Sequence, residues 1–312
     1  MASPSLQITS GIVPPKLVPG DLVAITSPAG HVPLEAIQPM IQALQQWGLL
    51  VRIGATLGQR EGTFGGNDEA RAADLQQLLD DPAVKAIYCA RGGYGCVRIV
   101  DRLDLRGLRA SPKWLIGFSD ITVLHSHLHQ QLGMATLHAP MAAAFADASA
   151  LAAIATIQQA LLGEPMDYPL LPHPRNRTGE ASGLLVGGNL RTLETLAGST
   201  SALNCEGKIL FLEDINEALY SVDRMFWHLQ RRGALSRLAG LVIGGFSHKP
   251  MDAGSLPFSL DLYDIVSEKV AGYRYPVCFD FPVGHQAHNL ALKCGVRHQL
   301  HVGTAGGRLW EA

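Results

Sequence analysis

The sequence predicts an α/β protein of two domains, the first built on a parallel sheet with helices on both faces. Through the first half of the chain, short apolar stretches of strand length alternate with stretches of helical periodicity, and the loops between them are short. A stretch dense in Pro, Gly and polar residues then interrupts this alternation, which is typical of a linker. The 312 residues, 47% of them hydrophobic, are enough for two cores. We therefore predict domains at 1–165 and 183–312, with a linker at 166–182.

The first domain consists of strands that each lead into a helix. The first strand, D-L-V-A-I-T at 21–26, ends in the turn residues Ser27-Pro28-Ala29-Gly30. Asp81-Pro82 ends a later helix, because the residue before a proline is disfavoured in the helical region. The predicted strands are 21–26, 49–53, 84–90 and 114–118, and the predicted helices are 34–47, 68–79, from after Gly95 to about 103, 120–130 and the Ala-rich 142–162.

The second domain shows the same kinds of element and ends in a hairpin. Gly187-Gly188-Asn189-Leu190 leads into a helix toward 196, and the apolar run at 207–212 is a strand that stops at Glu213-Asp214. The other predicted elements are helices at 218–230 and 260–270, strands at 238–244 and 277–281, and two short strands around a Gly-rich turn at 299–310.

Composition excludes several classes of function. The net charge is -2, from 25 basic and 27 acidic side chains, and no basic run is present, so we expect neither nucleic acid nor a membrane surface as partner. The N-terminus lacks the pattern of a signal peptide and no apolar stretch approaches 18 residues, which predicts a cytoplasmic protein. The five cysteines are widely spaced without a C-x-x-C pair, which argues against a disulfide framework or a zinc ribbon.

Ser119 lies on a predicted turn from strand to helix, in the sequence G-F-S-D-I. Such a turn presents a hydroxyl beside the unpaired N–H groups of a new helix, where a developing oxyanion is stabilised. Gly117 leaves room for the turn, but Ile121 stands where a G-x-S-x-G motif has its second glycine. The sequence therefore indicates either a nucleophile at Ser119 or a helix cap formed by Ser119 or Asp120.

Gly92-Gly93 follows another strand and lies at the same predicted edge of the sheet as Ser119. Glycines allow a close backbone approach, so an N–H group there is suited to complete an oxyanion hole. The alternatives are a plain turn or a phosphate site, although neither G-x-G-x-x-G nor a P-loop is present.

A serine nucleophile needs a base and an orienting acid, for which the chain offers several residues. His125, His127 and His129 suggest a metal site, but the glutamate of H-E-x-x-H is missing, so we interpret them as a solvated helix face with partly packed rings. His285 follows a strand in a loop, yet its position does not rank it above three other histidines, and Glu213 ends an apolar strand with two aspartates as rivals. The three other histidines are His138, His248 and His288, and the two aspartates are Asp120 and Asp214.

Six separated motifs, in order along nearly the whole chain, resemble the LD-carboxypeptidase family of serine peptidases. They are Ser27-Pro28-Ala29-Gly30, Arg91-Gly92-Gly93-Tyr94-Gly95, Gly117-Phe118-Ser119-Asp120, Gly187-Gly188-Asn189-Leu190, Glu213-Asp214 and Gly284-His285. The resemblance implies an N-terminal parallel-sheet α/β domain that bears the nucleophile and a smaller β-rich α+β C-terminal domain that bears the acid and the base. It also implies a cytoplasmic, metal-independent homodimer without a cofactor.

The resemblance also implies roles for individual residues. Ser119 would be the nucleophile, Glu213 the orienting acid and His285 the base, with the backbone N–H groups of Gly92 and Asp120 as oxyanion hole. Phe118 stands where many members have Tyr, and we expect its side chain to point into the sheet.

The implied reaction is hydrolysis of the bond between meso-diaminopimelate, or L-Lys, and the terminal D-Ala of murein tetrapeptides during cell-wall recycling. The D-Ala carboxylate calls for an arginine, and Arg91 and Arg224 are the candidates. A different branch of the family cleaves a peptidyl-nucleotide antibiotic as a self-immunity device, and this is the alternative function.

Overall fold

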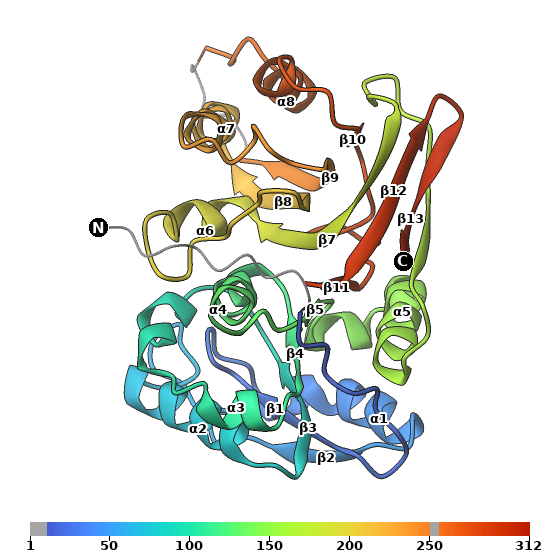
Figure 1. Cartoon of the computed structure of the whole chain (residues 1–312). Helices are drawn as coiled ribbons and strands as arrows, with labels where there is room; N and C mark the ends of the chain where they lie inside the picture. The colour runs from blue at the N-terminus through green and yellow to red at the C-terminus, as the bar shows by residue number, and fades with distance from the viewer. Residues whose placement is uncertain (1–10, 250–255) are drawn as a thin grey trace.

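The first sheet forms the lower half of the view in Figure 1, which shows the computed structural model; the structure describes residues 11–249 and 256–312. Five of its strands are parallel, and one strand from near the C-terminus pairs with them in the antiparallel direction. The strand order is β11 (Leu292–Cys294), β5 (Thr136–His138), β4 (Trp114–Gly117), β3 (Val84–Cys89), β1 (Leu22–Thr26) and β2 (Leu50–Ile53).

Helices cover both faces of this sheet. In β1, Val23 packs in the same core as Met40, whereas the neighbouring Ala24 packs on the other face with Leu75, as the alternation of side chains along a strand requires. None of the helices in the described part of the chain is long and apolar enough to span a bilayer. The first face carries α1 (Gln38–Gln46) and α5 (Leu151–Leu162), and the second carries α2 (Asp68–Asp80), α3 (Arg106–Ala110) and α4 (Thr122–Leu132).

The second sheet has seven strands, of which four are parallel and the remaining pairs antiparallel. Its helices α6 (Leu190–Thr195), α7 (Leu219–Arg231) and α8 (Leu262–Val270) share one apolar core with the parallel strands. The predicted fold class, a parallel-sheet α/β domain followed by a β-rich domain, is confirmed. The strand order is β10 (Val277–Cys278), β9 (Gly240–His248), β8 (Ile209–Glu217), β7 (Gly179–Asn189), β12 (Arg297–Gly303), β13 (Gly306–Glu311) and β6 (Asp167–Leu170).

The segment 166–182, which we expected to be a linker, contributes to the second sheet at both of its ends. It contains β6 and the first residues of β7. Pro169 lies within β6, which among the described strands is an edge strand that pairs with β13 alone. A proline is tolerated there because an edge strand has one side that needs no hydrogen-bond partner. The proline-rich composition that indicated a linker therefore also fits an edge strand.

Two predicted helices are shorter or more irregular than expected. The stretch after Gly95 forms only two 3-10 turns, 96–98 and 100–102, and its β-branched side chains at Val97, Ile99 and Val100 disfavour a helix. The predicted helix 142–162 begins as two 3-10 turns, because the Asp147 side chain accepts a hydrogen bond from the Ser149 N–H and starts a new turn there. Only 151–162 is α-helical.

The two domains are in close contact where β7 ends against the start of α4. The N–H of Asn189 donates to Thr122 Oγ1 over 3.1 Å, and a Cβ on Gly188 would lie 2.5 Å from the same oxygen. This contact fixes the end of β7, and with it the adjacent strand β8, relative to the turn that carries Ser119.

Candidate active site

Ser119 lies on the sharp turn between β4 and a 3-10 turn, 119–121, that continues into α4. Its φ of 64° is in the left-handed region, which is strained for a residue with a side chain and is typical of a nucleophile turn. Gly117 has a φ of 153°, and a Cβ there would lie 3.0 Å from Ile121 Cγ1. The turn therefore needs glycine at 117 but tolerates Ile121 in place of the second glycine.

The structure does not support the alternative that Ser119 or Asp120 caps the helix. The N-cap positions of the 3-10 turn and of α4 are Phe118 and Ile121, and within the described part of the chain neither makes a side-chain capping bond. The Asp120 carboxylate instead accepts a hydrogen bond from the Cys96 N–H over 2.8 Å, and burial raises its pKa. The Ser119 hydroxyl is left free for another partner.

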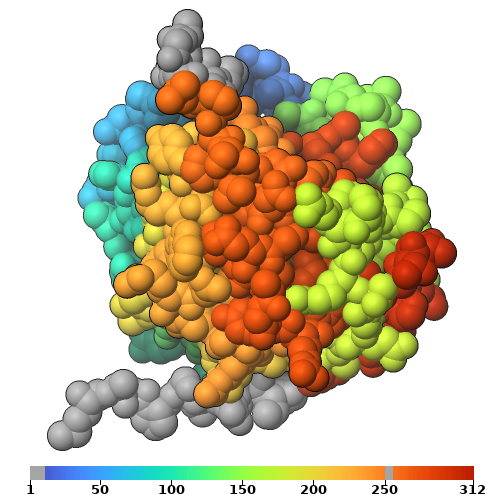
Figure 2. Space-filling model, turned by 90° about the horizontal axis from the view of Figure 1, so that it is seen from above, coloured from blue at the N-terminus to red at the C-terminus, as the bar shows by residue number. Residues whose placement is uncertain are grey.

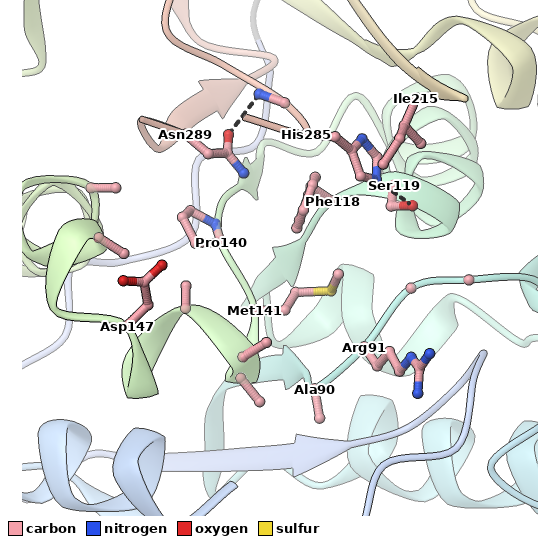
Figure 3. A pocket seen from close by; sticks show the side chains of 18 of the residues that line it. Ala90, Arg91, Phe118, Ser119, Pro140, Met141, Asp147, Ile215, His285 and Asn289 are labelled. Atoms are coloured by element: carbon pink, nitrogen blue, oxygen red, sulfur yellow. Dashed lines mark hydrogen bonds between the residues drawn. The ribbon is translucent and has the colours of Figure 1, made fainter. Parts of the chain in front are cut away.

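Ser119, His285 and Glu213 form one chain of hydrogen bonds, although 166 positions separate the first two. Figure 3 shows the part of this chain between Ser119 and His285. The Ser119 hydroxyl lies 3.1 Å from His285 Nε2, and His285 Nδ1 lies 2.6 Å from Glu213 Oε2. Because a carboxylate accepts only, Nδ1 carries the proton and Nε2 is left to accept the serine proton. The Glu213 side chain is fully buried and that of His285 is 15% exposed, so the base borders the cavity while the acid does not.

A tight turn at Gly284 holds the acid and the base together. The Gly284 N–H donates to Asn289 Oδ1 over 2.7 Å, and the His285 N–H donates to Glu213 Oε2 over 3.2 Å. Gly284 has a φ of 95°, and a Cβ there would lie 2.4 Å from Glu213 Cβ. Asn289 is a residue that sequence reasoning missed, since nothing in its local pattern indicates a bond to the turn five positions earlier.

Gly92 lies directly against the serine turn. A Cβ on it would be 2.8 Å from Ser119 Cβ and 3.2 Å from the backbone nitrogen of Asp120. The two predicted oxyanion-hole residues therefore lie beside each other and beside the hydroxyl, in an arrangement that only glycine at 92 permits.

The prediction that Phe118 points into the sheet is wrong. Its side chain borders the cavity, its ring centroid lies 4.7 Å from that of His285, and on its other side it packs against His138. The positive φ of Gly117 ends the strand one residue earlier, so the alternation of faces no longer applies at 118. Phe118 forms one wall against the imidazole of the predicted base.

The three histidines of α4 are buried, so the prediction of a solvated helix face is also wrong. His125, His127 and His129 are 2%, 7% and 3% exposed, because α4 packs between its own sheet and elements of the second domain. His125 Nε2 lies 2.8 Å from the Gly117 carbonyl oxygen, and burial lowers the pKa of His125 to about 4. Within 11–249 and 256–312 no cluster of three or more potential metal ligands occurs.

The rival bases and acids lie elsewhere or have other partners. His138 is fully buried behind Phe118, and burial holds its pKa well below the usual value, while His248 and His288 are exposed. Asp214 points away from His285: its carboxylate accepts hydrogen bonds from the Asn189 side chain and from the Arg191 N–H, each over 2.9 Å.

We expect Asp214 to make the free energy of unfolding depend on pH. Burial raises its pKa from 3.8 to about 6, so the folded protein binds this proton more tightly than the unfolded chain. Its contribution to the free energy of unfolding is therefore complete below about pH 4 and is lost as the pH rises through about 6. We expect the stability of the wild type relative to Asp214→Asn to fall by about 2 kcal/mol between pH 4 and pH 7. Urea unfolding of both proteins across this range measures the difference, and parallel curves would contradict the assignment.

A cavity of about 1000 Å³ opens beside Ser119 and His285 (Figure 3). Arg91 borders it and donates from Nη1 to the His31 carbonyl oxygen over 2.9 Å. Arg224 does not border it, but lies on α7 with its guanidinium 5.3 Å from the Tyr220 ring centroid. Of the two arginines predicted for substrate binding, the structure places only Arg91 at the cavity.

Comparison with known families gives matches in both domains. Residues 23–139 match the family described as LD-carboxypeptidase N-terminal domain, and residues 182–300 match the LD-carboxypeptidase C-terminal domain. These two ranges include Gly92, Ser119, Glu213 and His285.

Individual relatives and solved structures are similar over nearly the whole chain. A protein named "Probable murein peptide carboxypeptidase" from Bacillus subtilis is 32% identical, with 93% of this chain and 91% of the relative covered. The murein tetrapeptide carboxypeptidase of Pseudomonas aeruginosa is 31% identical, with 88% and 91% covered. The crystal structure of muramoyltetrapeptide carboxypeptidase from Oxalobacter formigenes has a TM-score of 0.83 at 29% identity, with 93% and 98% covered. The microcin C7 self-immunity protein has a TM-score of 0.84 at 21% identity, with 96% and 98% covered.

Proposed function

Because this chain belongs to the LD-carboxypeptidase family of serine peptidases, we propose that it hydrolyses the bond between an L-centre and the terminal D-Ala of murein tetrapeptides. Its enzyme class is that of a serine-type LD-carboxypeptidase. The residue before D-Ala in the proposed substrate is meso-diaminopimelate or L-Lys. The observation that carries the proposal is the chain of hydrogen bonds from Ser119 through His285 to Glu213, at the edge of a cavity large enough for a peptide end.

In the proposed reaction the Ser119 oxygen attacks the carbonyl carbon of the L,D bond while His285 Nε2 takes the hydroxyl proton. Glu213 holds the imidazole in the required tautomer and stabilises its positive charge. The backbone N–H groups of Gly92 and Asp120 stabilise the negative charge that develops on the carbonyl oxygen. His285 then gives its proton to the amine of the leaving D-Ala, and a water molecule, activated by the same ring, hydrolyses the acyl-enzyme.

The direct test is release of D-Ala by the full chain from L-Ala-γ-D-Glu-meso-diaminopimelate-D-Ala. We expect one D-Ala and one tripeptide for each peptide consumed. The matched control is the same peptide ending in L-Ala, which should be a poor substrate because the leaving residue has the opposite configuration. Failure to release D-Ala from the first peptide would refute the proposed function.

Arg91 is proposed to bind the carboxylate of the leaving D-Ala. Apart from His285 it is the one residue bordering the cavity, within the described part of the chain, that bears a basic side chain, and a guanidinium matches the geometry of a carboxylate. We expect Arg91→Gln to raise KM about tenfold, about 1.4 kcal/mol, with little change in kcat.

The control variant for this prediction is Arg224→Gln, which removes an arginine outside the cavity and should leave KM unchanged. A peptide ending in D-alaninamide provides a second control, because it lacks the carboxylate and should be cleaved equally poorly by wild type and Arg91→Gln. A normal KM for Arg91→Gln would mean that a group other than Arg91 binds the D-Ala carboxylate.

The alternative substrate is a peptidyl-nucleotide antibiotic. The likeness to the microcin self-immunity protein supports it little, because at 21% sequence identity the likeness shows a shared fold and not a shared substrate. An aminoacyl-nucleotide amide offered together with murein tetrapeptide separates the two proposals: we expect the tetrapeptide to be consumed first. The homodimer and the cytoplasmic location stay predictions, and analytical ultracentrifugation measures the former.

A further inference from the structure

One wall of the cavity consists mostly of small apolar side chains and contains a single acid. Between Pro140 and Ala153 the bordering residues are mostly alanines, and Asp147 lies among them. Within the described residues, Asp147 is the one acidic side chain that borders the cavity. An apolar wall that carries one carboxylate is complementary to an aliphatic chain that ends in an ammonium group.

Asp147 and Arg91 lie on different sides of the cavity, with the hydroxyl of Ser119 on a third (Figure 3). The two charges therefore face different parts of a bound substrate. If the reacting carbonyl of a peptide lies at Ser119, one part of the peptide would face the positive charge of Arg91 and another part the negative charge of Asp147. The cavity favours a substrate with a carboxylate on one side of the reacting bond and a cation on the other.

The Asp147 carboxylate has one oxygen that is free for a ligand. Its Oδ1 accepts hydrogen bonds from the Ser149 N–H over 2.8 Å and from the Ser149 hydroxyl over 2.7 Å, while Oδ2 has no hydrogen bond among the described residues. These bonds lower the pKa of Asp147, which is therefore ionised at neutral pH. The same bonds fix the direction of the carboxylate, so an incoming cation meets an oriented acceptor.

We propose that Asp147 binds the ammonium group at the far end of the diamino acid that precedes the D-Ala and so selects substrates whose side chain at that position bears an ammonium group. This inference rests on the proposed function and adds a specificity determinant to it. The acyl part of the substrate lies along the alanine wall with its ammonium at Asp147, and the leaving residue lies toward Arg91. Asp147 takes no part in the chemical step, so its contribution is to binding.

The test compares two tetrapeptides that differ only in the distal ammonium group: one with meso-diaminopimelate and one with 2-aminopimelate at the third position. We expect the wild type to prefer the first about tenfold in kcat/KM, through KM. In Asp147→Asn this preference should fall to less than about twofold with kcat almost unchanged. Asparagine still caps the turn through its side-chain oxygen, so the fold should persist.

The matched control is Asp261→Asn, because Asp261 is an exposed aspartate that also caps a helix, α8, through its side chain and does not border the cavity. It should keep the wild-type preference. If the wild type cleaves both peptides equally well, or if Asp147→Asn keeps the preference, the inference is wrong while the proposed function stands. If the wild type releases D-Ala from neither peptide, the proposed function itself fails and the inference fails with it.

Discussion

Replacing Ser119 by alanine is expected to lower kcat for D-Ala release by a factor on the order of 10⁴ to 10⁶. The variant keeps His285, Glu213 and the Gly92 turn, but it lacks the oxygen that would form the acyl-enzyme. Alanine removes one atom from a residue at φ 64° and adds no contact, so the fold should be unchanged. Cleavage that remains would come from the oxyanion hole and from substrate positioning.

The measurement is single-substrate kinetics together with covalent labelling by a serine-directed phosphonate, detected by mass. The wild type should gain one label per chain and Ser119→Ala none. Ser236→Ala is the matched control, because the Ser236 hydroxyl donates to the Gly233 carbonyl oxygen and, in the part of the chain that the structure describes, does not border the cavity. Near-normal turnover by Ser119→Ala would refute the assignment of the nucleophile.

The sequence predicted most of the strands and helices of the first domain, because their apolar residues recur at the spacing typical of each element. The strand at 84–90 and the helix at 68–79 agree closely with β3 and α2. It missed β5, which has only three residues, 136–138, and pairs with β11 from the far end of the chain. A strand so short has no apolar alternation to detect, and one of its two partner strands lies about 150 positions away.

The sequence predicted the individual residues of the candidate site, but not the contacts that bring them together. Ser119, Glu213 and His285 each lie where an apolar strand ends or shortly after it, a pattern that local sequence contains. What brings them together is not local: Thr122 contacts Asn189 across the two domains. The burial of His127 fails to show in the sequence for the same reason, since its ring contacts the Ser201 hydroxyl of the other domain over 2.8 Å, and α4 packs against α6 and β7 of that domain.

Replacing Gly284 by alanine should have the second largest effect, a fall in kcat of about 10³ to 10⁴. Loss of the orienting acid in a Ser-His-Asp site costs about that much. An added Cβ would lie 2.4 Å from Glu213 Cβ and 2.5 Å from Glu213 Oε2, so the carboxylate must move. Glu213 is fully buried and its other oxygen has no hydrogen-bond partner among the described residues. Its orientation therefore depends on His285 alone. Moving the carboxylate by the roughly 1 Å that an ordinary contact with the new Cβ needs would lengthen the 2.6 Å bond to His285 Nδ1 beyond hydrogen-bond distance.

Gly20→Ala separates this effect from the backbone strain that alanine brings at any such position. Gly20 has a φ of 92°, close to the 95° of Gly284, but a Cβ there would meet nothing within 4 Å. Both variants should lose about 1 kcal/mol of unfolding free energy through the strain, whereas only Gly284→Ala should lose activity. Thermal unfolding and kcat, measured on both, test this. Equal activities would mean that the site adapts to the displaced carboxylate, and that Glu213 does not orient His285 through the contact at Gly284.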